Sequence, residues 1–291
     1  MTSSPENPAD RRGGCPAGLR SARSAEELAQ TERLETYYDK ATSTVLQTIE
    51  RSVCGCSYGG CSWTTRAEAE GIAALLELRP GRRLLDVGAG SGWPGLYMAQ
   101  TTGCDVTLVD LPLAGLRIAA ERAITDALPG TCWVVVGDGA DLPFANSAFD
   151  AISHSDVLCC LRDKRGVLRS CRRVLEGGGT MAFSVISLAP GLSGAVYRRA
   201  VECGPEFIEC DADYPTLLEQ TGWQILQTQD VSEAFAQSSR RMREVEAEHA
   251  DELQALLGPD GYAERKSNLK RHHSGAEEGL IRREIFLAAP A

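Results

Sequence analysis

The sequence predicts an α/β protein with a doubly wound, Rossmann-like sheet, and three observations indicate this class. Short apolar runs alternate with helix-length amphipathic segments from about residue 65 to residue 187. The apolar runs are nearly continuous and end at turn residues, which is typical of strands buried on both faces of a parallel sheet. A glycine-rich turn follows the first run, at the edge where such sheets bind ligands.

The elements follow one another in a regular order. Strands are predicted at residues 82–88, 105–110, 132–138, 149–156 and 180–187, with helices at 93–102, 113–125 and 164–175. After them we expect a short helix at 214–222, a strand at 223–231, one long helix at 232–258 and a terminal strand at 280–290. Ligands are expected in the crevice beyond the carboxyl ends of the strands.

The first part of the chain has a different composition. Residues 1–24 contain almost no large apolar side chain and are predicted to be a disordered tail. Residues 25–51 carry apolar side chains at spacings that predict two amphipathic helices. A loop rich in Gly and Cys follows, so residues 25–64 are expected to form a helical lid. The remaining domain, residues 65–291, begins with a helix near Thr65 and contains a lid insertion at about 188–214, where Pro and Gly interrupt the alternation.

Composition excludes several classes of function. Thirty Lys and Arg stand against forty Asp and Glu, a net charge of −10, so the chain lacks the positive field of nonspecific nucleic-acid or membrane-surface binding. No window approaches about 18 consecutive apolar residues, so neither a membrane span nor a secretory signal is predicted, and we expect a cytoplasmic protein. Eleven scattered cysteines indicate reduced thiols. A small-molecule partner is expected; the oligomeric state stays open, with a homodimer as one alternative.

The first candidate site is the segment LLDVGAGSGWPG, in which a strand ends near Asp86. Gly88, Gly90 and Gly92 form the turn before the next helix, and they let the backbone approach a ligand closely. Such a turn can bind the pyrophosphate of a dinucleotide or the amino-acid and ribose portion of another adenosine cofactor. The turn alone does not decide between these ligands.

Two acidic residues end the next two strands. Asp110 comes 22 residues after Gly88, at a spacing that lets a carboxylate accept hydrogen bonds from ribose hydroxyls. Asp138 ends the third strand, within GDGADLPF, where it can accept from an adenine amine. A nicotinamide oxidoreductase needs no adenine site at this position, and the sequence shows no catalytic pair of tyrosine and lysine for one.

From Thr65 to Ser187 the sequence resembles the class I S-adenosylmethionine-dependent methyltransferases, in their small-molecule branch. The resemblance rests on four ordered motifs: LLDVGAGSG, VTLVD, GDGADLPFANSAFDAISHSDVLCCL and CRRVLEGGGTMAFS. It implies a sheet of seven strands with the last one antiparallel, here residues 280–290. It also implies a helical lid with a YYD-type segment, here Tyr37, Tyr38 and Asp39.

The resemblance assigns the cofactor site residue by residue. The glycine loop would hold the methionine end of S-adenosylmethionine, Asp110 the ribose diol, and Asp138 with its neighbours the adenine, while Asp86 would orient the loop or the amino group. Trp63 could wall the sulfonium by a cation–π contact. The full set of expected cofactor contacts is Tyr38, Trp63, Asp86, Gly88, Ala89, Gly90, Gly92, Asp110, Leu111, Asp138, Gly139, Ala140 and His154.

Methyl transfer needs a base only where the nucleophile keeps its proton. His154 is the base candidate because it ends the fourth strand, at the edge expected to face the methyl group. Tyr38 is the second candidate catalytic residue, from the lid. His272 and His273 lie in the basic run ERKSNLKRHH and are predicted to be exposed to solvent.

Two other functions remain as alternatives. Cys54, Cys56 and Cys61 form a C-x-C-x4-C cluster. This spacing does not match structural zinc sites, and no metal requirement is expected, but thiolates could assist methylation of a soft metalloid such as arsenite. The chain could also bind S-adenosylmethionine without turnover. The predicted function is therefore methyl transfer from S-adenosylmethionine to O, N or C of a small molecule.

Overall fold

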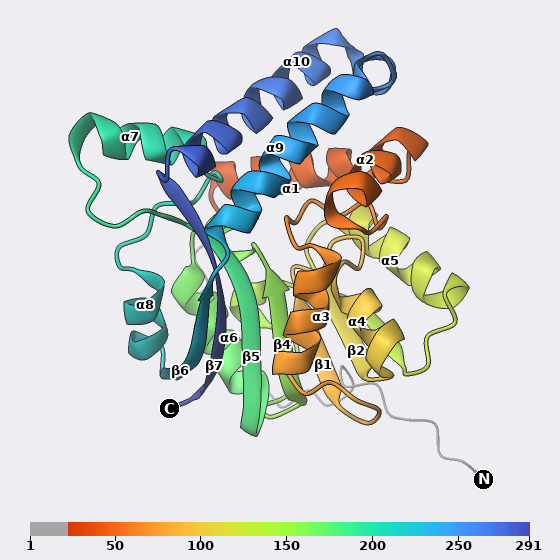
Figure 1. Ribbon diagram of the computed structural model, residues 1–291. Helices are drawn as coiled ribbons and strands as arrows, with labels where there is room; N and C mark the ends of the chain where they lie inside the picture. Colours follow the sequence, from red (N-terminus) through yellow and green to blue (C-terminus); the bar gives the residue numbers. More distant parts are fainter. Residues whose placement is uncertain (1–22) are drawn as a thin grey trace.

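Residues 23–291 are described by a computed structural model, and they build one seven-stranded sheet (Figure 1). The strand order is β3-β2-β1-β4-β5-β7-β6. The strands are β1 (Arg83–Val87), β2 (Asp105–Asp110), β3 (Cys132–Val136), β4 (Phe149–Ser155), β5 (Leu175–Leu188), β6 (Trp223–Asp230) and β7 (Ile281–Pro290). The first five strands are parallel to one another, while β7 runs antiparallel to both β5 and β6. The predicted doubly wound sheet with one antiparallel strand is confirmed.

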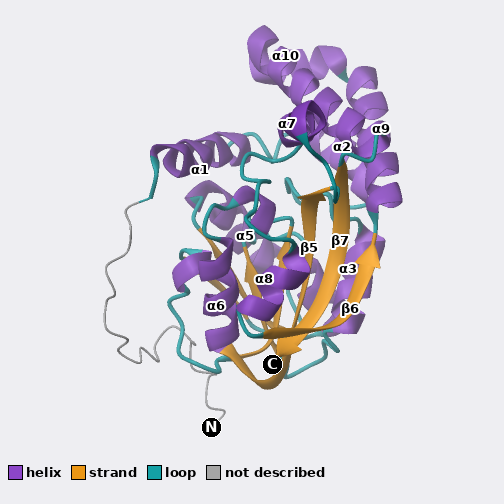
Figure 2. Cartoon of the chain, turned by 90° about the vertical axis from the view of Figure 1, so that its left-hand side faces the viewer, coloured by secondary structure: helices purple, strands orange, loops and turns teal. Residues whose placement is uncertain are grey.

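Helices cover both faces of the sheet (Figure 2). Side chains such as Ile72 and Leu96 form the core on one face, and Leu168 and Leu217 belong to the core on the other. The first face carries α3 (Arg66–Leu75), α4 (Gly95–Thr102) and α5 (Leu113–Thr125); the second carries α6 (Lys164–Val174) and α8 (Tyr214–Gln220). The central strands β1, β2 and β4 are therefore buried on both sides, which explains their nearly continuous apolar sequences, whereas the edge strands β3 and β6 are partly or largely exposed.

The N-terminal helices lie beyond one end of the strands (Figure 1). They are α1 (Ala25–Tyr38) and α2 (Thr44–Cys54). Ser24 caps α1, since its hydroxyl accepts from the backbone N–H of Glu27 and the Glu27 carboxylate accepts from the backbone N–H of Ser24. Ser24 is thus a helix cap rather than the end of a disordered tail, while residues 1–22 of that predicted tail lie outside the described residues.

The C-terminal half contains a helical hairpin that the sequence predicts only in part. The expected single helix at 232–258 has the right extent but is interrupted at His249. Helix α9 (Ser232–Glu248) ends at His249, and α10 (Ala250–Glu277) turns back along it, with a kink where Gly258 precedes Pro259. The basic run ERKSNLKRHH lies within α10. Between β5 and α8, helix α7 (Gly194–Cys203) lies beside α10 (Figure 1).

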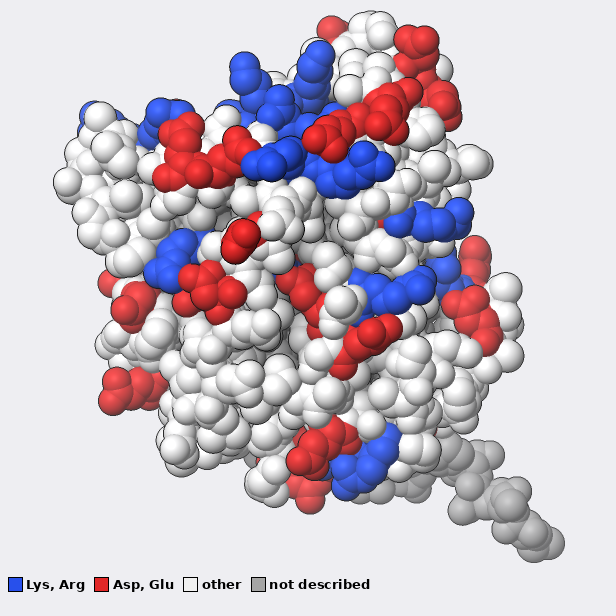
Figure 3. All heavy atoms as spheres, in the orientation of Figure 1, with Lys and Arg blue, Asp and Glu red and all other residues white. Residues whose placement is uncertain are grey.

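Among residues 23–291 we find no helix that is both long and apolar enough to span a membrane. Acidic and basic side chains alternate over the face shown in Figure 3, with Lys and Arg gathered toward the α9–α10 hairpin.

Candidate active site

The glycine loop after β1 has a backbone that only glycine adopts easily. Gly88, Gly90 and Gly92 have φ angles of 71°, 52° and 98°. A Cβ atom at Gly88 would lie 2.5 Å from Cγ2 of Val157, and one at Gly90 would clash with the hydroxyl of Tyr38. The loop therefore combines a strained backbone with close approach of side chains from two other segments.

Asp86 lies beneath this loop, and its hydrogen bonds connect β1 with β4 and α4. Its Oδ1 accepts a 2.6 Å hydrogen bond from the Ser153 hydroxyl in β4, and its Oδ2 accepts one of 3.1 Å from the backbone N–H of Gly95 in α4. The side chain is buried, and this desolvation raises its pKa to about 7.

The two acidic residues expected to contact the adenosine portion lie at the ends of β2 and β3. Asp110 accepts hydrogen bonds of 2.7 Å from the backbone N–H groups of Gly90 and Leu111, and burial raises its pKa to about 6. Asp138 accepts a 2.9 Å bond from the backbone N–H of Ala140, at the start of the 3₁₀ turn Gly139–Asp141. Because β1, β2 and β3 are parallel neighbours, the loop and both carboxylates lie along one edge of the sheet.

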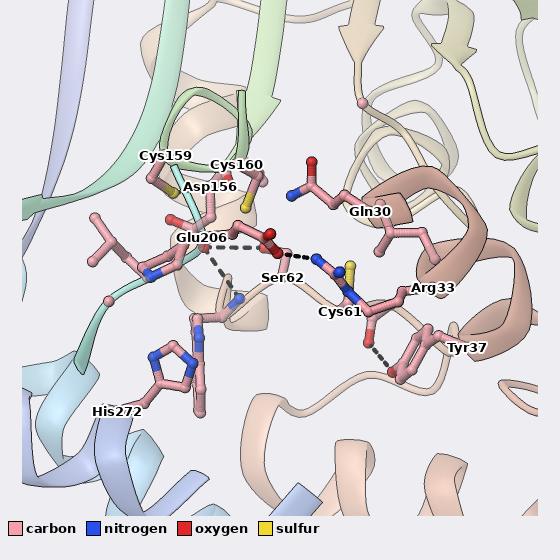
Figure 4. Close-up of a pocket in the computed structure, with 18 of the residues that line it drawn as sticks. Gln30, Arg33, Tyr37, Cys61, Ser62, Asp156, Cys159, Cys160, Glu206 and His272 are labelled. Carbon is pink, nitrogen blue, oxygen red and sulfur yellow. Dashed lines mark hydrogen bonds and ion pairs between the residues drawn. The ribbon is translucent and has the colours of Figure 1, made fainter. Parts of the chain in front are cut away.

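A cavity of about 610 Å³ opens at this edge, between the sheet and the helices above it (Figure 4). Of the expected cofactor contacts, Tyr38, Trp63, Gly88 and Ala89 line it. The others expected at the site are not among its lining residues: Asp86, Gly90, Gly92, Asp110, Leu111, Asp138, Gly139, Ala140 and His154.

The inner end of the cavity has two polar atoms without partners. The hydroxyl groups of Ser91, in the glycine loop, and Ser155, at the end of β4, are buried and make no hydrogen bond to other described residues. A buried hydroxyl without a partner loses its interaction with water and gains nothing in return. Both groups are therefore available to a polar ligand at the glycine loop.

Tyrosines of α1 cover the inner end. The Tyr37 hydroxyl donates a 2.9 Å hydrogen bond to the carbonyl of Gly60, and the Tyr38 hydroxyl lies 3.4 Å from Sγ of Cys61. Burial raises the pKa of both phenols, so both remain protonated at neutral pH. Sequence reasoning found these residues through the YYD segment, and the structure places both against the cavity.

Sequence reasoning missed Asp156, which holds the floor of the cavity. Its Oδ1 accepts from Arg283 Nε (2.9 Å) and from the Ser184 hydroxyl (3.1 Å). Its Oδ2 accepts from the backbone N–H of Trp63 (3.2 Å) and from the Ser62 hydroxyl (3.4 Å) (Figure 4). One carboxylate thus connects the last strand to the loop that carries Trp63.

The prediction that His154 acts at the site is not supported by its position. Its ring is fully buried and stacks on Phe183, with 4.4 Å between ring centroids, and it does not line the cavity. Neither ring nitrogen has a hydrogen-bond partner among the described residues. Burial lowers the pKa of His154 to about 3. Successive side chains of a strand point to opposite faces, so Ser153 contacts Asp86 while His154 enters the other core.

The prediction that His272 and His273 are exposed is wrong. His273 is buried against α9, with Nδ1 3.2 Å from the Ser239 hydroxyl and Nε2 3.2 Å from the Glu277 carboxylate. His272 points to the other side of α10 and lines the cavity (Figure 4). Consecutive residues of an α-helix are rotated by about 100° about its axis, so the two side chains point in different directions from α10.

The outer end of the cavity is polar and lies between α1, α7 and α10. Arg33 of α1 forms an ion pair with Glu206, which follows α7 (Figure 4). The remaining polar side chains at this end are Gln30, Glu202, Asn268 and Arg271. The cavity therefore extends from the glycine loop to a charged mouth formed by segments outside the sheet.

Comparison with known proteins indicates which reaction this site supports. A family model described as a methyltransferase domain matches residues 85–183, which contain the glycine loop and both acidic strand ends. Methyltransferase GfsG of Streptomyces halstedii is 29% identical over 202 residues, or 68% of this chain and 71% of that protein. Residues 85–183 thus match a methyltransferase domain, and the fold is that of S-adenosylmethionine-dependent methyltransferases.

Two further proteins are similar to the methyltransferase. The 27-O-demethylrifamycin SV methyltransferase of Amycolatopsis mediterranei is 29% identical over 174 residues, which cover 58% of this chain and 64%, less than two thirds, of that relative. Among solved structures, phosphoethanolamine N-methyltransferase 2 of Haemonchus contortus, in complex with S-adenosyl-L-methionine, has a TM-score of 0.70 at 17% identity. The structural match covers 88% of this chain and 60% of the Haemonchus contortus chain.

The residues at the sheet edge fit S-adenosylmethionine, the cofactor of this family. The loop backbone leaves no room for side chains, and the two free hydroxyls of Ser91 and Ser155 lie beside it, as a ligand with a charged amino-acid end requires. Cys54 and Cys56 pack in a core cluster with Trp93, whereas Cys61 lines the cavity.

Proposed function

We propose that the methyltransferase acts on a small-molecule acceptor that enters through the charged mouth of the cavity and presents an O, N or C nucleophile. One observation carries this proposal: a single cavity joins the glycine loop to the polar outer end between α1, α7 and α10. S-adenosylmethionine supplies a methyl group on a sulfonium sulfur, ready for in-line displacement. The acceptor must then lie beyond the glycine loop, in the outer part.

The chain's own tasks are positioning and exclusion of water. We infer that the Ser91 and Ser155 hydroxyls bind the amino-acid end of the cofactor, and that Asp110 and Asp138 bind the ribose and the adenine. Tyr37, Tyr38 and Trp63 close the inner end, because they lie over it from α1 and from the loop that Asp156 holds. Helices α1 and α2 and the segment after β5 serve as the lid.

Methylation of a soft metalloid is not favoured, although Cys61, Cys159 and Cys160 all line the cavity. Binding of a soft metal needs thiolates. Burial raises the pKa of Cys61, and a hydrogen bond with Cys159 together with burial raises that of Cys160 well above its ordinary value. These two groups are therefore protonated thiols at neutral pH.

Nucleic acid is also a poor candidate for the acceptor. The net charge of −10 opposes it. The basic side chains of the α9–α10 hairpin alternate with acidic ones, among them Glu244 beside Arg241 (Figure 3). The run ERKSNLKRHH is therefore not part of a continuous basic surface.

The first experiment is calorimetric titration of S-adenosylmethionine and S-adenosylhomocysteine into the wild type and Asp110→Ala. We expect micromolar binding to the wild type and a loss of at least about tenfold in the variant, the equivalent of about 1.4 kcal/mol. Acceptor screening by mass spectrometry follows, with a product heavier by one CH₂ group as the readout. Cofactor binding without product from any acceptor would favour a noncatalytic binding protein.

A further inference from the structure

The cavity contains few groups that can accept a proton. A hydroxyl acceptor keeps its proton at neutral pH, so its methylation needs a base close to the reacting oxygen. The phenols of Tyr37 and Tyr38 and the thiols of Cys61 and Cys160 are protonated and cannot accept one.

The carboxylates of the cavity are engaged or solvated. Both oxygens of Asp156 accept hydrogen bonds, and Oδ1 also pairs with Arg283. Glu206 is in an ion pair with Arg33. Glu202 is exposed on α7 and faces water. None of these three groups combines burial with a free proton-accepting atom.

His272 combines burial with a free proton-accepting atom. Its side chain projects from α10 to the cavity (Figure 4), and its Nδ1 is buried without a hydrogen-bond partner among the described residues. Burial and the neighbouring Arg271 lower the pKa of this imidazole, while the backbone of Cys203 raises it to a smaller extent. The imidazole is therefore neutral at pH 7 and able to accept a proton.

A close contact between two helices places this imidazole. Gly275 lies one turn after His272 on α10, and a Cβ there would be only 2.5 Å from Cβ of Cys203. The absence of a side chain at 275 thus lets the end of α7 approach α10. This approach brings the backbone of Cys203 to the ring of His272 and sets the ring's direction.

We propose that His272 is the general base of the methyltransferase and that its acceptor is an alcohol or a phenol. This inference rests on the proposed function and specifies its substrate class. The proton of the acceptor hydroxyl passes to the imidazole, and an oxygen lone pair forms the new bond to the methyl carbon. The bond between that carbon and sulfur breaks, and its electron pair stays on sulfur. The imidazolium then returns the proton to water.

The test compares His272→Gln with Lys270→Gln, an exposed position of the same helix that does not line the cavity. Both variants are titrated with S-adenosylhomocysteine, and binding equal to wild type is expected. Rates are then measured with 27-O-demethylrifamycin SV as the hydroxyl probe and sarcosine as the amine probe. With the hydroxyl probe, kcat should fall by about 100-fold or more in His272→Gln and stay unchanged in Lys270→Gln. Free imidazole should restore part of the activity of His272→Ala.

Several results would overturn the proposal. One is equal kcat for wild type and His272→Gln, and another is a wild type that methylates sarcosine but not the hydroxyl probe. Where neither probe is methylated, labelling by diethyl pyrocarbonate at pH 7 decides the matter. Modification of His272 ahead of the fully bonded His273 supports a free neutral imidazole, and modification of His249 alone contradicts it. Failure of cofactor binding would instead contradict the proposed function itself.

Discussion

Arg283 of β7 and Asp156 at the end of β4 form a buried ion pair, with Nε 2.9 Å from Oδ1, between residues 127 positions apart. The guanidinium also binds Glu68 Oε1 (2.7 Å) and the Thr64 hydroxyl (3.0 Å), at the start of α3. Arg283 is 1% exposed. One side chain therefore connects the last strand, the cavity floor and the start of α3.

Replacing Arg283 should destabilise the whole domain. In Arg283→Met the carboxylates of Asp156 and Glu68 stay in place without their cation, and breaking a buried pair in this way costs about 3–5 kcal/mol. The matched control is Arg282→Met, because Arg282 pairs with Asp230 at the surface, where the loss should be below about 1 kcal/mol. Urea denaturation measures both, and equal losses would contradict the central role of Arg283.

A methyl group at Gly90 should weaken cofactor binding. The φ angle of 52° costs a side chain about 1–2 kcal/mol, and the added Cβ collides with the Tyr38 hydroxyl. We expect Gly90→Ala to lose at least about tenfold in affinity for S-adenosylhomocysteine. Adding Tyr38→Phe removes the colliding oxygen and should recover part of the loss. Calorimetric titration of the two variants tests this, and wild-type affinity in Gly90→Ala would show that the loop does not hold the cofactor.

The buried His154 should make the fold sensitive to acid. Its pKa is about 3 in the folded protein and about 6.5 when unfolded. Between these values the unfolded chain binds the additional proton, so the free energy of unfolding falls as pH drops from 6.5 toward 3, by up to about 1.4 kcal/mol per pH unit. His154→Leu should flatten this dependence while methyl transfer is retained. Urea midpoints at pH 8 and pH 5 provide the measurement. An unchanged slope, or loss of activity at full stability, would restore His154 as a site residue.

Two glycines in helices should respond in opposite ways to alanine. In Gly275→Ala the new methyl overlaps Cys203, so α7 must move away, at a cost of about 1–3 kcal/mol. In Gly71→Ala, inside α3, no atom lies within 4 Å of the new Cβ, so we expect a gain of about 0.5–1 kcal/mol from helix propensity. Thermal unfolding of both variants is the comparison; stabilisation by both would mean that α7 and α10 are not tightly packed.

Local patterns were sufficient to predict the sheet and the glycine loop. Asp86 and Asp110 lie at the ends of β1 and β2, and Asp138 follows the end of β3, so the parallel arrangement of these strands brings the three carboxylates to one edge. The turn after β1 can also be predicted from the sequence, because three glycines in five residues indicate a backbone with positive φ angles.

The outer half of the site could not be found in this way. His272 reaches the cavity only because α10 folds back along α9 past Gly258 and Pro259, which brings the helix face with Asn268, Arg271 and His272 to the cavity. The partnership of Asp156 with Arg283 joins β4 to β7, and no pattern within either strand records it. His154 does lie at the end of β4 as its sequence position predicts, but the alternation of side chains along the strand directs its ring into the core against Phe183.

The location of β7 also bears on how the protein is made. Residues 281–290 are synthesised after every other strand, yet they lie inside the sheet, between β5 and β6. Until they emerge from the ribosome, β5 has a bare edge, β6 has no neighbour, and Arg283 is not present to neutralise Asp156. The nascent chain must therefore carry an open sheet edge from the completion of β5 until β7 is made, and the buried pair of Arg283 with Asp156 can form only then.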